Sequence, residues 1–136
     1  DIVMCRHAQF SLSEVYRVLK PNGLFITQQV HERDKQNIKK IFGRGQGFIN
    51  KTNKLLLNII KQAKKYKFRK IKYKISNKPY FFKAKKDLIE FLKMTPVISN
   101  FDPILEKAKI QRIISMYTTK KGIKSNSARF LIIMRK

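Results

Sequence analysis

The chain has 136 residues, enough for one modest domain with a hydrophobic core, and its 32 Lys and Arg against 8 Asp and Glu give a formal charge of +24. Its single cysteine, Cys5, excludes an internal disulfide and a cysteine-clustered metal site, and it fits a reducing, cytoplasmic compartment. No apolar run approaches the about 20 residues that a membrane helix requires, so we expect no membrane partner.

The high positive charge has two interpretations. A field of this sign concentrates nucleic acid and other anions around a protein. The basic residues are mostly lysines, however, and they are spread along the sequence, which is the arrangement of an ordinary solvated surface. Composition alone therefore leaves open a basic nucleic-acid-binding module beside an ordinary basic globular domain.

The first predicted elements are a strand and a helix. The continuous apolar run over residues 2–5 predicts a strand buried on both faces of a parallel sheet. Because a natural domain seldom begins inside such a strand, we interpret the chain as a fragment. Ser11 and Glu14 have the spacing of a capping box, in which each side chain bonds the other residue's amide. The apolar residues that follow share one helical face: Leu12, Val15, Tyr16 and Leu19.

A turn and a second strand follow this helix. Pro21 ends the helix because it biases the preceding residue away from helical angles. Asn22 and Gly23 both tolerate positive φ and predict the turn, and residues 24–30 predict the next strand. Two parallel strands joined by a helix form the βαβ unit, so the sequence predicts an α/β fold.

The remaining sequence predicts four helices and two strands. Two of the helices are expected over residues 34–42 and 85–94. A third follows a cap at Thr52 and has an apolar stripe of Leu55, Leu56, Ile59, Ile60 and Ala63. The fourth extends from a cap at Asp102 to about Tyr117, with Leu105, Ala108, Ile113 and Ile114 facing inward. The strands are expected over residues 68–75 and 129–134. In the first of these, Ile71, Tyr73 and Ile75 alternate with lysines, which favours a half-exposed edge strand over a nucleic-acid stripe.

A glycine motif, G-x-G-x-G, begins at Gly43 and ends at Gly47 in a loop that extends to about residue 50. A nucleotide-binding loop follows a strand and opens a helix, so that backbone amides converge on the ligand. Here an amphipathic helix precedes the motif, and no acidic residue follows at the distance where a ribose would be held. We therefore expect Gly43 to end a helix and the loop to bind no cofactor.

The candidate site residues follow the first predicted strand. Arg6 and His7 are expected at the carboxyl ends of the strands, where open α/β sheets bind their ligands, although the pair also fits a loop that only leads into the helix. His31 occupies a similar position after the second strand. Cys5 is predicted to be a buried structural cysteine rather than a nucleophile, because a reactive thiol requires a partly exposed, electropositive site.

These segments together resemble a known family. The stretch DIVMCRHAQF…EVYRVLKPNGLFITQQV resembles the middle of a class I S-adenosylmethionine-dependent methyltransferase of the methyltransferase type 11 kind. The family's R-x-L-K-P-G-G-type turn is matched by Arg17, Leu19, Lys20, Pro21 and Gly23, with Asn22 in place of a glycine. The closing SARFLIIMRK resembles the final antiparallel strand of a subgroup that acts on small molecules, and TPVISNFD resembles its insertion before the last helix.

The resemblance implies a partial fold. The family sheet has the order 3-2-1-4-5-7-6, and residues 1–136 would supply strands 4-5-7-6 as a single partial Rossmann-like domain. The N-terminal half, which carries the cofactor's glycine loop and the acidic residue for its ribose, would be absent. The edge at residues 2–4 would then be open where strand 1 pairs.

The resemblance also implies a function and a site. Cys5, Arg6 and His7 would border the sulfonium of S-adenosylmethionine and the methyl acceptor, and residues 50–101 would cover an acceptor pocket for a small molecule. The catalytic residues stay unassigned, because positioning can suffice for an in-line displacement. The fragment alone is expected to be inactive, with the missing N-terminal half as a partner chain. The alternative function is the basic nucleic-acid-binding module.

Overall fold

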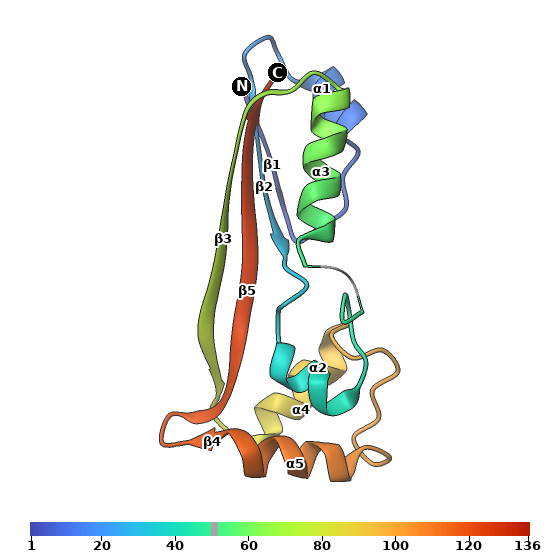
Figure 1. Cartoon of the computed structure of the whole chain (residues 1–136), viewed down its shortest axis with the longest axis vertical. Helices are drawn as coiled ribbons and strands as arrows, with labels where there is room; N and C mark the ends of the chain where they lie inside the picture. Colours follow the sequence, from blue (N-terminus) through green and yellow to red (C-terminus); the bar gives the residue numbers. More distant parts are fainter. Residues whose placement is uncertain (50–51) are drawn as a thin grey trace. The chain divides into compact units, whose positions relative to one another are not determined.

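The computed structural model describes residues 1–49 and 52–136, so the expected end of the glycine loop at residue 50 lies outside the described residues. In chain order the elements are β1 (Ile2–Arg6), α1 (Leu12–Val18), β2 (Leu24–Val30), α2 (Gln36–Phe42), α3 (Lys54–Lys65), β3 (Arg69–Phe82), α4 (Lys85–Met94), α5 (Lys107–Tyr117), β4 (Thr118–Thr119) and β5 (Gly122–Arg135). The fold is mixed α/β, with an open five-stranded sheet and flanking helices (Figure 1). Over the described residues, every helix is too short or too polar to cross a bilayer.

The sheet has the order β1-β2-β5-β3, and the short strand β4 pairs with β5. β1 and β2 are parallel, with Ile2 opposite Leu24, and β5 runs antiparallel to β2, with Met134 opposite Phe25. α1 connects the parallel pair, which confirms the predicted βαβ unit. β1 and β3 are the two ends of this order.

The described residues divide into two compact units. Unit 1 comprises Asp1–His31, Lys51–Ser76 and Ala128–Lys136, and unit 2 comprises Glu32–Asn50 and Asn77–Ser127. The long strands β3 and β5 contribute residues to both.

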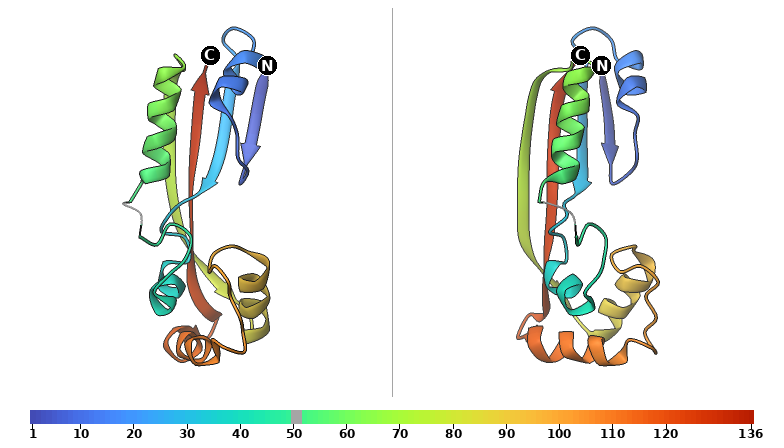
Figure 2. Two further views of the ribbon diagram at one scale, coloured as in Figure 1. Left: turned by 90° about the vertical axis from the view of Figure 1, so that its right-hand side faces the viewer. Right: turned by 45° about the vertical axis from the view of Figure 1, so that its right-hand side comes forward.

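In unit 1, helices α1 and α3 pack on one face of the sheet (Figure 2). The core combines the apolar stripes of both helices with alternate strand residues: Leu12, Val15, Leu19, Phe25, Leu56, Ile59, Ala63, Phe68, Phe130, Ile132 and Met134. The Ser11 hydroxyl accepts a hydrogen bond from the Glu14 amide, as the capping spacing predicted. The Glu14 carboxylate, however, pairs with Arg17 instead of reaching back to the cap.

The prediction that the first strand is buried on both faces is wrong. Ile2 is 60% exposed and Met4 is 75% exposed, whereas Val3 and Cys5 pack against the core. β1 lies at an end of the sheet, and the two described helices of unit 1 both pack on the face of Val3. The continuous apolar pattern therefore marks a strand with one face uncovered in this part of the chain.

In unit 2, helices α2, α4 and α5 lie together around the start of β5 (Figure 2). Their buried apolar residues form a second core: Ile38, Phe42, Phe82, Leu88, Leu92, Val97, Ile98, Ile113 and Ile123. α2 ends at Gly43, whose φ of 68° is left-handed, and this confirms Gly43 as the predicted helix stop.

Three helix starts differ from the predictions. α2 begins at Gln36 rather than residue 34, because Lys35 is left-handed, with φ of 51°. α3 is preceded by Asn53, not Thr52, as its N-cap residue. The Asp102 carboxylate accepts hydrogen bonds from the amides of residues 104 and 105, so it caps a separate turn, and α5 starts only at Lys107.

Several residues expected inward are exposed. Leu55 is 44% exposed beside the buried stripe of α3, and Leu105 is 84% exposed because it precedes α5. Ala108 is exposed as well. In β3, Ile71 packs on the core, but Tyr73 and Ile75 remain 58% and 41% exposed.

Both late strands are longer than predicted. β3 extends from Arg69 to Phe82, and it contains Pro79, a residue that sheets accept mainly in end strands such as this one. β5 extends from Gly122 to Arg135, well beyond the predicted residues 129–134. Its buried residues alternate toward the C-terminus, which is the pattern of a strand with one covered face.

Candidate functional site

The candidate site predicted from sequence lies at the carboxyl ends of β1 and β2. The Cys5 thiol donates to the Ala8 carbonyl at 3.3 Å, and the Gln29 amide nitrogen lies 3.9 Å from the sulfur. The same Gln29 nitrogen donates to the Ala8 carbonyl at 3.1 Å and to the Thr27 hydroxyl at 2.9 Å. The thiol is therefore hydrogen-bonded to neutral groups, and Cys5 is half-buried, not buried as predicted.

Arg6 and His7 continue the chain past Cys5 and are exposed. Arg6 is the last residue of β1 and lies opposite Gln28 in the parallel register. The His7 backbone is left-handed, with φ of 52°, and its amide donates to the Gln28 carbonyl at 2.9 Å. This bend turns the chain away from the strand and presents the two side chains at the strand ends.

His31 follows β2 but is not an open rim residue. It is buried, its Nε2 lies 2.7 Å from Asn53 Oδ1, and its ring meets Phe130 edge-on with centroids 6.3 Å apart. These contacts fix the ring between α3's cap residue and the core. The predicted rim position of His31 is therefore corrected to a buried packing position.

A shallow hollow of about 360 Å³ lies beside the strand ends in unit 1. It is lined by Met4, Cys5, Arg6, Ile26, Gln28 and Leu131. Ile26, Gln28 and Leu131 alternate with the core residues of their strands, so the hollow lies on the uncovered face of the sheet. Arg6 faces this hollow with Met4; Cys5 contributes to its lining, but the Cys5 side chain packs with Val3 against the core on the other face.

The groups at the strand ends do not complete a site for S-adenosylmethionine. Such a site requires an acidic residue for the ribose hydroxyls. Unit 1 contains two acidic side chains, Asp1 and Glu14. The Asp1 carboxylate accepts a hydrogen bond from the Lys20 amide, and the Glu14 carboxylate forms an ion pair with Arg17. No group of three or more His, Cys, Asp or Glu that could hold a metal occurs within residues 1–49 and 52–136.

The glycine motif of unit 2 is a structural loop. Gly45 has φ of 143°, and a Cβ there would lie 2.6 Å from the Val97 carbonyl oxygen. The intervening Arg44 makes two hydrogen bonds to the Glu106 carboxylate, at 2.7 and 3.1 Å, and donates to the Ser99 carbonyl. The motif therefore anchors the segment before α5, and its amides do not converge on an open site.

Glu106 carries a lowered pKa in this arrangement. The largest cause is the hydrogen bond from Arg44, which stabilises the charged carboxylate. A smaller contribution comes from Lys109, whose ammonium lies 3.3 Å from the carboxylate. The Arg44 guanidinium is stabilised in turn, and its pKa is raised by the same bond. The pKa of Asp102 is lowered by the backbone amides of Leu105 and Ile104.

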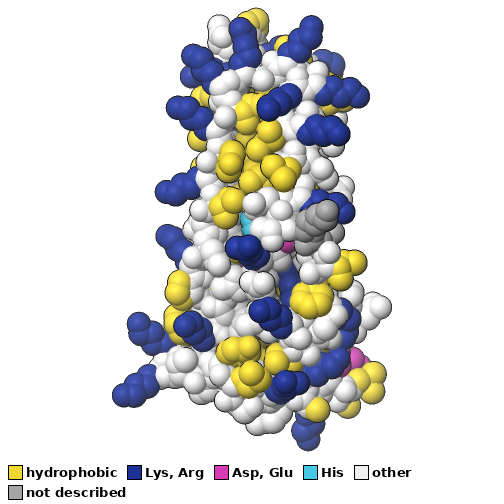
Figure 3. Space-filling model, viewed as in Figure 1, with side chains coloured by type: hydrophobic (Ala, Val, Ile, Leu, Met, Phe, Trp, Pro, Cys, Tyr) yellow, Lys and Arg dark blue, Asp and Glu magenta, His cyan; other side chains and the backbone are white. Residues whose placement is uncertain are grey.

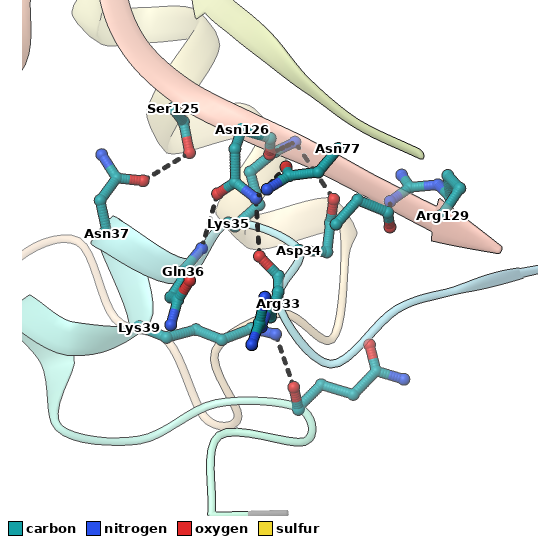
Figure 4. Close-up of polar contacts among 12 residues, drawn as sticks. Arg33, Asp34, Lys35, Gln36, Asn37, Lys39, Asn77, Ser125, Asn126 and Arg129 are labelled. Atoms are coloured by element: carbon teal, nitrogen blue, oxygen red, sulfur yellow. Dashed lines mark hydrogen bonds and ion pairs between the residues drawn. The ribbon is translucent and has the colours of Figure 1, made fainter. Parts of the chain in front are cut away.

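A polar network in unit 2 was not predicted from the sequence (Figure 4). Lys35 is 2% exposed. Its ammonium donates a hydrogen bond to the Asn126 carbonyl at 2.9 Å and lies 4.2 Å from the centre of the Tyr80 ring. The Asp34 carboxylate lies 3.8 Å from this ammonium. Lys39 is equally buried, and it donates to the carbonyls of residues 32 and 46. No local sequence signal distinguishes these two lysines from exposed ones.

The comparisons with known proteins support only the fold. No family model and no curated protein matches the sequence. The fold is similar to that of a solved crystal structure from Bacillus halodurans C-125 described as a "putative methyltransferase", with a TM-score of 0.55 and 16% sequence identity. The similarity covers 99% of this chain and 63% of that chain, so this chain spans less than two thirds of the other's length. The mixed α/β fold of the described residues is therefore consistent with part of a methyltransferase-like fold.

Proposed function

We propose that the chain is the second half of a class I S-adenosylmethionine-dependent methyltransferase. The observation that carries the proposal is the sheet order β1-β2-β5-β3, with β1 and β2 parallel and β5 antiparallel between β2 and β3. This order corresponds to strands 4-5-7-6 of the family sheet. The solved structure of similar fold adds support, since it is longer than this chain.

In this proposal residues 1–136 form one partial domain, and the N-terminal half pairs with the open edge of β1. That half would supply the glycine loop and the acidic residue that the strand ends lack. The exposed Ile2 and Met4 support the assignment, because a parallel strand inside a complete sheet is covered on both faces. The free Cys5 supports a reducing, cytoplasmic location.

The proposed site comprises Cys5, Arg6 and His7, beside the cofactor's sulfonium and a small-molecule acceptor. When bound, the cofactor supplies an activated methyl group. The chain's own contribution is positioning: Gln29 holds the loop after β1 through the Ala8 carbonyl, and the bend at His7 directs the exposed side chains toward the strand ends. No base is assigned.

The coding sequence upstream of Asp1 tests the proposal. We expect an in-frame strand followed by G-x-G-x-G and, about 20 residues further on, an Asp or Glu for the ribose. An upstream frame with a different pattern, or a stop codon directly before Asp1, would overturn the assignment to half of a methyltransferase.

A second candidate function is nucleic-acid binding, and a specific observation favours it in unit 1. Its basic side chains are exposed on α3, on β3 and between them: Lys61, Lys64, Lys65, Lys67, Arg69, Lys70, Lys72 and Lys74. Tyr73 lies between two of them in the sequence and is 58% exposed, although its side chain alternates with theirs along the strand, and an exposed ring can stack on a base. Figure 3 shows Lys and Arg spread over the face in view, with Asp and Glu only at isolated points.

Fluorescence anisotropy with a labelled single-stranded RNA tests this second candidate. Binding is expected at low salt and should fall steeply as salt rises. The variant Lys72→Gln/Lys74→Gln should bind more weakly than Lys120→Gln/Lys121→Gln, which removes the same charge from unit 2. No binding at low salt, or equal losses in the two variants, would remove the proposed surface.

A further inference from the structure

Unit 2 contains an open cavity of about 400 Å³ that lies apart from the Cys5 strand ends. Its lining comes from α2, β3, α5 and β5, and the residues that matter here are Gln36, Lys40, Asn77, Tyr117, Lys124 and Asn126. The volume falls within the range of about 300–1,000 Å³ typical of small-molecule sites.

The wall of this cavity is held by hydrogen bonds to the Asn126 side chain (Figure 4). Asn126 Oδ1 accepts from the Gln36 backbone amide at 2.8 Å. Its Nδ2 donates to the Arg33 carbonyl at 2.7 Å and to the Asn77 side-chain oxygen at 2.9 Å. One side chain thus ties α2 and the segment before it to β3 and β5, so the cavity is preformed.

A second set of bonds fixes the neighbouring wall. The buried Ser125 hydroxyl donates to the Asn37 side-chain oxygen at 2.7 Å, and Asn37 Nδ2 donates to the Lys124 carbonyl at 3.0 Å. Behind Asn126, the buried Lys35 ammonium donates to the Asn126 carbonyl. The framework of the cavity therefore does not depend on the charged side chains at its mouth.

Four side-chain groups at the cavity remain unused within the described part of the chain. The ammonium groups of Lys40 and Lys124, the Gln36 side-chain amide and the Tyr117 hydroxyl have no hydrogen-bond or ion-pair partner among the described residues. All four can donate a hydrogen bond. Lysine ammonium groups also bind phosphate as point charges.

The charge at the cavity is not balanced by its lining. No Asp or Glu is among the lining residues, which all belong to the described part of the chain. Five of the six carboxylates in unit 2 are engaged as follows: Glu106 with Arg44, Asp34 with Lys35, Glu90 with Lys86, Asp87 with the Ala84 amide, and Asp102 with the turn after it. The field at the mouth is therefore positive, and an anion would gain from entering.

We propose that this cavity binds a small phosphate-bearing compound, with Lys40 and Lys124 contacting the phosphate and Gln36 and Tyr117 completing its hydrogen bonds. A tetrahedral anion with several acceptor oxygens matches four donors that reach one cavity from different elements. The site is in unit 2 and does not depend on methyl transfer at the strand ends.

Inorganic phosphate is the direct probe, titrated into the ¹⁵N-labelled chain at constant ionic strength and followed by NMR. We expect saturable shifts of the backbone amides of Gln36, Lys40 and Lys124. The variant Lys40→Gln/Lys124→Gln should bind phosphate at least about tenfold more weakly, because each lost ammonium removes a charge-assisted hydrogen bond. Its spectrum without phosphate reports whether the fold is retained.

The matched control is Lys64→Gln/Lys65→Gln, which removes the same charge from the exposed face of α3. It should bind phosphate like the original chain. Equal weakening in the two variants would identify diffuse attraction to a basic protein and overturn the site, as would phosphate shifts that fail to saturate. Sorbitol, an uncharged polyol, should cause no shift in these amides, and tighter binding of sorbitol than of phosphate would also contradict the proposal.

Discussion

The two units of the chain are stabilised by different means. In unit 1, two amphipathic helices cover one face of the sheet, and the core residues are apolar side chains at helical and strand spacing. In unit 2, a second apolar core is accompanied by the buried Asp34, Lys35 and Lys39 and by the hydrogen bonds of Asn126. An apolar core tolerates changes among apolar side chains, whereas a buried charge destabilises the fold when any of its partners is removed.

This difference also separates the candidate sites. At the strand ends of unit 1, the hollow beside Cys5 is shallow and lies on an uncovered face of the sheet. The cavity of unit 2 has a hydrogen-bonded wall and unused donors. The first arrangement fits a surface that another segment completes, and the second fits a site complete in itself.

The largest expected effect comes from the core of unit 1. Phe25→Ala should lower the free energy of unfolding by about 4 kcal/mol, because Phe25 is fully buried and its removal leaves a cavity. Urea unfolding followed by circular dichroism measures the change. Val18→Ala, at an α1 position that is 51% exposed, should cost far less, and similar losses for the two variants would contradict the assigned core.

The next effect concerns the buried charges of unit 2. Lys35→Met keeps the side-chain length but leaves the Asp34 carboxylate without the nearby ammonium, and it should cost about 3 kcal/mol. The same urea experiment applies, with Lys40→Met on the exposed side of α2 as the control. If Lys35→Met were as stable as the control, the account of unit 2 would be wrong.

A smaller effect tests the anchor at the glycine loop. Glu106→Gln should cost about 1–2 kcal/mol at neutral pH, because the charge-assisted bonds to Arg44 are weakened. The pKa of Glu106 is lowered in the folded chain, so its contribution is present above the ordinary value of 4.5 and is lost as pH falls through the folded value.

The pH dependence of unfolding separates this ion pair from simple packing. The difference in stability between the original chain and Glu106→Gln should shrink below pH 4.5, where the carboxylate becomes protonated in both the unfolded and then the folded chain. Thermal unfolding between neutral and acidic pH measures the difference. A constant difference across that range would show that the charge of Glu106 contributes nothing.

The smallest effect on stability is expected at the uncovered face of unit 1. Met4→Ser should change the free energy of unfolding by less than about 0.5 kcal/mol, because Met4 is 75% exposed. It should nevertheless reduce self-association, since exposed apolar side chains on an end strand favour contact between molecules. Light scattering over a concentration series gives the result, and unchanged association would argue against an interactive face.

Local patterns predicted much of the fold. The Ser11 cap, the helical spacing after it and the Asn22-Gly23 turn are short-range signals, and the βαβ unit followed from them. The uncovered face of β1 was not predicted, because the run Ile2–Met4 reads the same whether helices cover one face or two. The length of β5 was missed because its first half is polar and gains its partners from distant segments.

The candidate sites were less predictable. The position of Cys5, Arg6 and His7 at the strand ends follows from strand order, and their functional roles stay predictions. The contact of His31 with Asn53 depends on tertiary packing, and no spacing of residues in the sequence predicts it. Buried lysines contradict the ordinary preference of that residue for solvent, so Lys35 and Lys39 become visible only in the structure.

Calorimetric titration of S-adenosylmethionine tests the central claim most directly. It compares the chain of residues 1–136 with the longer chain that the proposal predicts, in which an N-terminal half precedes Asp1. The account predicts no saturable binding to residues 1–136, whose strand ends lack the cofactor's glycine loop and ribose carboxylate, and micromolar binding to the longer chain. Micromolar binding to residues 1–136 alone, or none to the longer chain, would contradict it.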